Sequence, residues 1–88
     1  MRVFESKMKE VKETTNYIIE DLKLTKDEFP FIYQFNDLVN GYCGSSIGGL
    51  KVMMVSVMET FPTMEDDFKQ VQVERFCSRL SMYLENIV

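Results

Sequence analysis

The hydrophobic positions of this chain recur at helical spacing in four separate stretches. Over residues 3–23 they follow alternating steps of four and three, which places them on one face of a helix: Phe4, Met8, Val11, Thr15, Ile18 and Leu22. Charged residues such as Glu5, Lys9 and Glu13 fall on the other side at helix-neighbour spacing. The pattern predicts an amphipathic helix over residues 3–23.

A second helix is predicted over residues 26–40. Thr25 and Glu28 have the spacing of a capping box, in which each side chain bonds the backbone of the other. Pro30 is favoured as the first residue of a helix and disfavoured inside one. We therefore expect a short turn at 26–29 and a regular helix beyond it, with a broad apolar face: Phe31, Ile32, Phe35, Leu38, Val39 and Tyr42.

Two further helices are predicted, over residues 46–61 and 64–86. The first of them carries a full apolar face and two more apolar residues, Val52 and Val55, on its flank, so most of its circumference is apolar. The last helix is expected to start after Thr63 as its cap. Its buried face is predicted to contain Phe68, Val73, Phe76, Cys77, Leu80, Leu84 and Ile87.

All four glycines lie within residues 41–49, between the second and third predicted helices. Such a cluster indicates a hinge, or a place where the backbone approaches another group closely. Four helices with short connections predict an all-α fold. We expect a small four-helix bundle of two helical hairpins joined by a Gly-rich turn at 41–49, and a single domain over 1–88. A core of this size is small, and such chains often gain stability by self-association.

Composition and charge narrow the function classes. The chain is 45% hydrophobic and 27% charged, as in a folded globular domain, and its net charge is −4. An acidic domain binds phosphate backbones poorly, because both are negatively charged, so we do not expect nucleic acid as a partner. A helix-turn-helix reader is further disfavoured because the third predicted helix carries one basic residue, Lys51.

The sequence lacks the residue arrangements that are typical of catalytic and metal sites. There is no histidine, no paired-cysteine spacing and no calcium-loop spacing, so we expect no enzyme activity, no metal and no cofactor. Cys43 and Cys77 are expected to be free thiols. The charged start of the chain lacks the apolar core of a signal peptide, and no run reaches the length of a membrane span. We therefore expect a cytoplasmic protein without membrane contact.

The glycine-rich segment partly matches a phosphate-binding loop. Lys51 stands one residue late, no hydroxyl follows it and no strand precedes the segment, so the nucleotide-hydrolase motif is rejected. A helix N-terminus remains, which can bind a small anionic ligand such as a nucleotide. The candidate ligand-binding residues for this alternative are Tyr42, as a stacking ring, Ser45, Ser46, Gly48, Gly49 and Lys51.

The leading hypothesis is a non-enzymatic interaction protein. Methionine side chains adapt to apolar partners, tyrosine suits interfaces, and exposed valines would leave a patch that a monomer avoids. The candidate contact residues are Val52, Val55, Met54, Met58 and Tyr33. We expect self-association through the first and third helices as a homodimer or higher oligomer, or a role as a small inhibitor or adaptor of another protein. Small helical chains of this composition are common among phage and mobile-element accessory proteins that block host factors.

Overall fold

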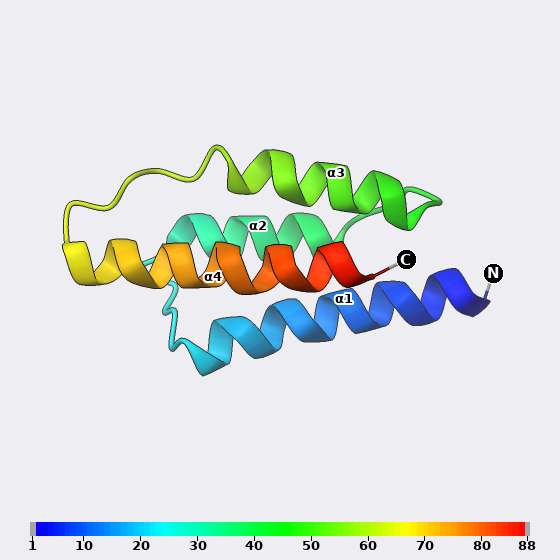
Figure 1. Ribbon diagram of the computed structural model, residues 1–88, viewed down its shortest axis with the longest axis horizontal. Coiled ribbons are helices and arrows are strands. Elements are labelled where there is room, and N and C mark those ends of the chain that lie inside the picture. Colours follow the sequence, from blue (N-terminus) through cyan, green and yellow to red (C-terminus); the bar gives the residue numbers. More distant parts are fainter. Residues whose placement is uncertain (1, 88) are drawn as a thin grey trace.

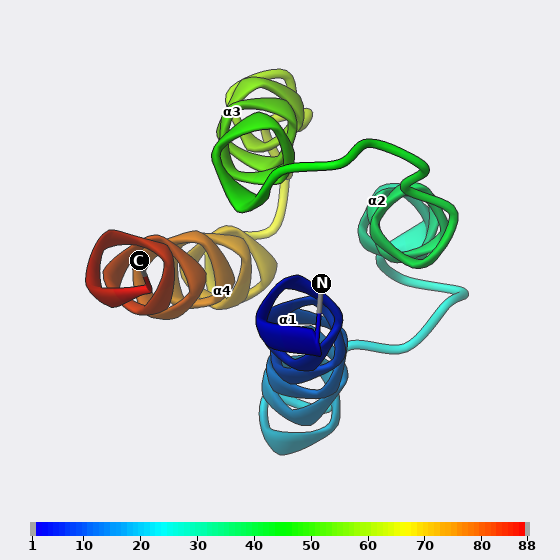
Figure 2. The same ribbon diagram turned by 90° about the vertical axis from the view of Figure 1, so that its right-hand side faces the viewer.

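The computed structural model describes residues 2–87, and within that range it contains four helices and no strand. α1 spans Arg2–Asp21, α2 Pro30–Asn40, α3 Ile47–Met58 and α4 Asp67–Asn86. Consecutive helices run antiparallel along the long axis (Figure 1). Seen from the end where α1 begins, they follow one another anticlockwise around the bundle (Figure 2). The predicted all-α four-helix bundle is confirmed.

The core lies along the bundle axis and receives side chains from every helix. The α1 face predicted from the sequence points inward, and Ile19 beside it is also buried. Thr15 is the polar member of this face, and its hydroxyl donates a hydrogen bond of 2.8 Å to the Val11 carbonyl, so its burial leaves no unpaired group. The largest fully buried side chains are Phe35, Phe76, Leu24, Ile32, Leu50, Met54, Leu80 and Leu84.

An aromatic cluster joins α2 to α4 across the bundle. The ring centroids of Phe35 and Phe76 lie 5.8 Å apart with their planes at 90°. Phe61 contacts both, at 5.7 Å from Phe35 and 6.3 Å from Phe76. Edge-to-face contacts such as the two made by Phe35 add to the energy of apolar burial. Because Phe61 lies beyond the end of α3, the cluster also anchors the connection between α3 and α4.

The turn between α1 and α2 forms as predicted. The Thr25 hydroxyl donates to Glu28 Oε1 at 3.1 Å and accepts from the Glu28 backbone N–H at 3.4 Å. The Phe29 N–H donates to the Thr25 carbonyl at 2.8 Å, which closes the turn. α2 then begins at Pro30, where the missing N–H costs nothing. The predicted turn at 26–29 with a regular helix beyond it is confirmed.

α1 ends two residues earlier than predicted, in a left-handed cap. Lys23 has a φ of 55°, and its N–H donates to the Glu20 carbonyl at 3.1 Å. The Leu24 N–H reaches back to the Ile19 carbonyl at 3.0 Å. These two bonds define a Schellman motif, which satisfies carbonyls at a helix end. Leu24 and Ile19 are both buried, so the cap is sealed by an apolar contact.

α3 and α4 are shorter at their shared connection than the sequence indicated. α3 ends at Met58 instead of residue 61, and α4 begins at Asp67 instead of residue 64. The predicted cap at Thr63 is wrong. Asp66 is the N-cap, and its carboxylate accepts from the backbone N–H groups of Phe68 and Lys69 at 2.8 and 3.2 Å. A carboxylate that satisfies two free donors is the stronger cap.

Phe68 was predicted to lie on the buried face of α4, and this is also wrong. Its side chain is 73% exposed. Phe68 precedes Val73 by five residues, a spacing that rotates it away from the face formed by Val73, Phe76, Leu80 and Leu84. Cys77, predicted on the same face, is half-buried at its edge and is a free thiol, as is Cys43.

Candidate functional site

The outward side of α3 is apolar at its centre. Val52 is 72% exposed and Val55 is 41% exposed, whereas Leu50 and Met54 on the opposite side are fully buried. The two valines border a shallow hollow with a volume of about 390 Å³, lined by Lys51, Val52, Val55, Ser56 and Glu59. The extra apolar flank that the sequence predicted for this helix therefore lies on the surface of the described chain.

The other three candidate contact residues have internal roles. Met54 and Met58 are buried in the core, because they follow Leu50 at steps of four along the inward face of α3. Tyr33 is half-buried against the core, and its hydroxyl donates a hydrogen bond of 2.6 Å to the Leu24 carbonyl. Tyr33 thus ties α2 to the end of α1. Of the five candidate contact residues, Val52 and Val55 are therefore the two that are exposed on the surface.

The glycine-rich segment is organised by Tyr42. The Tyr42 hydroxyl donates to the Ser46 carbonyl at 3.0 Å. A Cβ atom at Gly44 would overlap the Tyr42 ring, and one at Gly49 would lie 2.6 Å from its hydroxyl oxygen. Neither glycine has a positive φ, so backbone conformation does not require them. At Gly44 and Gly49 the end of the Tyr42 side chain lies directly against the backbone, so a Cβ atom at either position would require that side chain to move, while Gly48 faces open space.

The structure brings only part of the candidate anion-binding set together: Tyr42, Ser46 and Gly49 contact one another, whereas Lys51 does not join them. Ser46 is the N-cap of α3, and its hydroxyl oxygen accepts from the Gly49 N–H at 3.1 Å. Lys51 points the other way, and its Nζ donates to the Ile87 carbonyl at 3.4 Å, at the end of α4. Ser45 is exposed on the loop. The polar groups near the start of α3 are thus largely used in internal hydrogen bonds.

We predict that Gly44→Ala lowers the free energy of unfolding by about 1–2 kcal/mol, because the added methyl group displaces the Tyr42 ring and breaks its hydrogen bond. Urea denaturation followed by circular dichroism measures the change. Gly48→Ala is the matched control, since open space and a helical position make alanine neutral or stabilising there. Equal stability of the two variants would show that Tyr42 packing is not the reason for Gly44.

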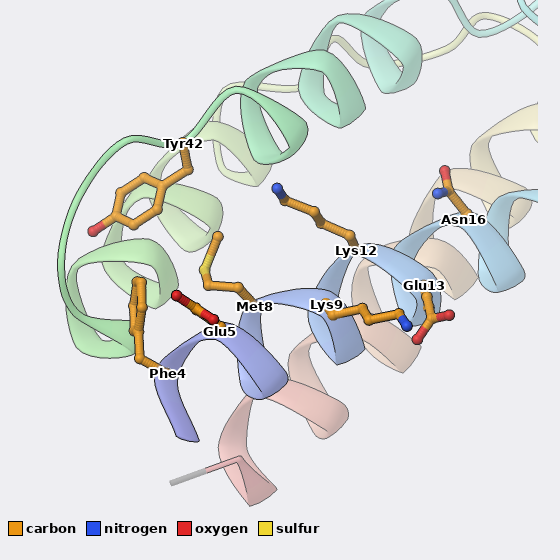
Figure 3. A pocket seen from close by; sticks show the side chains of 8 residues that line it. All are labelled: Phe4, Glu5, Met8, Lys9, Lys12, Glu13, Asn16 and Tyr42. Atoms are coloured by element: carbon orange, nitrogen blue, oxygen red, sulfur yellow. The ribbon is translucent and has the colours of Figure 1, made fainter. Parts of the chain in front are cut away.

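A second hollow, of about 430 Å³, lies between α1 and the glycine-rich segment. Its lining residues are Phe4, Glu5, Met8, Lys9, Lys12, Glu13, Asn16 and Tyr42. Figure 3 shows Phe4, Met8 and Tyr42 at one end and Lys9 with Glu13 at the other. Charges of both signs lie along α1 in this hollow, so it does not favour a ligand of either charge.

The perturbed ionisable groups remain protonated at neutral pH. Burial, with a smaller contribution from Glu74, raises the pKa of the Cys77 thiol. Burial, with Glu10 of α1 nearby, raises the pKa of Tyr83 to about 12. A raised pKa reduces the nucleophilic thiolate or phenolate form of each group. No group of metal-binding side chains is present among residues 2–87.

No family model, no curated protein and no solved structure matches this chain. None of the helices in the described range is both long enough and apolar enough to cross a membrane.

Proposed function

We propose that this chain is a non-enzymatic interaction module that associates with itself through the outward face of α3. The observation that carries the proposal is the exposure of Val52 and Val55 on a helix whose opposite face is already fully used by the core. Burying adjacent exposed apolar side chains lowers the free energy, because contact with another protein surface removes them from water.

The chemistry of this face suits a protein more than a small molecule. The two valines line the hollow on α3, and Lys51 and Glu59 are the charged residues of its lining. An apolar centre with polar surroundings is the usual anatomy of a protein interface. A helical face of this kind is also how small inhibitors and adaptors bind larger proteins. The internal hydrogen bonds of Ser46 and Lys51 leave the alternative of an anionic ligand with less support.

We predict that Val55→Asp weakens self-association about 30-fold or more, because the interface would have to desolvate a carboxylate. Multi-angle light scattering over a range of protein concentrations measures the oligomer, and circular dichroism checks that helix content is retained. Leu38→Asp is the control, since it makes the same kind of change at an exposed position of α2. A wild-type chain that is monomeric throughout, or a Val55→Asp oligomer of wild-type size, would refute the proposal.

A further inference from the structure

Two exposed stripes of the bundle have the same spacing. On the outward face of α3 and its last turn, Val52, Val55 and Glu59 follow one another at steps of three and four. On α4 the same steps of three and four separate two apolar residues and one charged residue, in that order: Phe68, Val71 and Arg75. Steps of three and four place residues along a single seam of a helix, as in coiled coils. The two seams match position by position, with opposite charges at the third.

All six side chains are accessible to a partner. Phe68 is 73% exposed and Val71 is 43% exposed, comparable to the two valines of α3. Glu59 and Arg75 are exposed too, and neither forms an ion pair with any side chain among residues 4–87. Arg79, one turn after Arg75, differs because it is paired with Asp21 of α1. The free charges of the two seams are therefore those at the matching third position.

The two seams cannot pair within one molecule. α3 and α4 are neighbours that run antiparallel (Figures 1 and 2), whereas residues matched in the same order require parallel helices. Both seams are also exposed to solvent instead of facing each other. Any pairing of the matched seams must therefore join two copies of the chain.

We propose that the α3 seam of one copy packs in parallel against the α4 seam of a second copy. Val52 then lies beside Phe68, Val55 beside Val71, and Glu59 beside Arg75. The hollow of about 390 Å³ on α3 provides space for the large Phe68 side chain. This assignment rests on the proposed function, because it takes the outward face of α3 as the self-associating surface. The assignment goes further by naming the α4 seam of a second copy as the surface that covers this face.

The pairing has a consequence for symmetry. Each copy presents one α3 seam and one α4 seam, so the contact joins two different surfaces and is heterologous. Such contacts continue from copy to copy, either into a closed ring or into an open chain. A dimer closed by one two-fold axis is the exception, in which both α3–α4 contacts form between the same two copies.

Charge reversal tests the pairing. Glu59→Arg alone and Arg75→Glu alone each place like charges together, so each variant by itself should associate about tenfold more weakly than the wild type. An equimolar mixture should regain association close to that of the wild type. In the mixture, each seam with a reversed charge meets an opposite charge on the other variant. Sedimentation velocity over a series of concentrations measures the separate variants and the mixture.

The control variant is Glu20→Arg, which makes the same change in net charge as Glu59→Arg, but on the exposed side of α1, and should leave association unchanged. Unchanged association of Arg75→Glu, with Val55→Asp monomeric, would overturn the pairing and leave the α3 interface of the proposed function intact. A mixture that associates no better than its components would overturn the pairing as well. Circular dichroism of each variant excludes loss of folding as the cause.

Discussion

Phe35→Ala is expected to lower the free energy of unfolding by about 3–5 kcal/mol, the range for removing a buried phenylalanine ring. Phe35 is fully buried, and its ring makes nearly perpendicular contacts with Phe61 and Phe76. Alanine would leave a cavity at the point where α2, α4 and the end of α3 meet. A domain of this size has a total stability of roughly 4–13 kcal/mol, so the variant would lose a large part of it.

Urea denaturation followed by circular dichroism at 222 nm measures this loss, at a protein concentration where wild type and variant have the same oligomeric state. Phe68→Ala is the matched control, because it removes the same ring from an exposed position of α4. Its expected effect on unfolding is within about 0.5 kcal/mol. Equal losses for the two substitutions would contradict the placement of Phe35 in the core and Phe68 on the surface.

The second large effect is expected for Met54→Ala, with a loss of about 2–5 kcal/mol. Met54 is fully buried on the inward face of α3, although its neighbour Val55 is exposed. For a domain of this length, such a loss lowers the melting temperature by about 10 °C or more. Thermal unfolding measured by circular dichroism checks this expectation.

Val52→Ala provides the comparison on the same helix. Its side chain is exposed, and alanine is a better helix former than valine, so stability should be unchanged or slightly higher. Val52→Ala should instead weaken self-association, since it removes part of the proposed contact. A large loss of stability in Val52→Ala, or none in Met54→Ala, would reverse the inward and outward assignment of α3.

The elements that the sequence predicted correctly depend on neighbours along the chain. The seam of α1 is read from residues three and four apart, and the turn before α2 depends on Thr25, Glu28 and Pro30. The ends of the helices were less predictable where they depend on contacts with residues far away in the sequence. α3 stops at Met58, and Phe61 beyond it packs against Phe35 and Phe76, residues that no local pattern places beside it.

The candidate site divides in the same way. The sequence indicated that α3 has more apolar residues than one face requires, with Val52 and Val55 lying outside the predicted inward face. Met54 and Met58 were predicted as contact residues together with the two valines. A helix that is apolar on most of its circumference has several possible inward faces, and the sequence does not distinguish between them. The position of α3 against its neighbours selected the face with Leu50, Met54 and Met58 for burial.

The sequence by itself determined four helices, a turn at 26–29 and a surplus of apolar surface on α3, because helical periodicity and capping depend on residues within one or two turns. Only the tertiary structure decided that Tyr42 lies against Gly44 and Gly49 and that Phe68 faces solvent. Those outcomes depend on where separate segments meet in space. Contacts of that kind are determined by the packing of the whole bundle, so the spacing of nearby residues does not predict them.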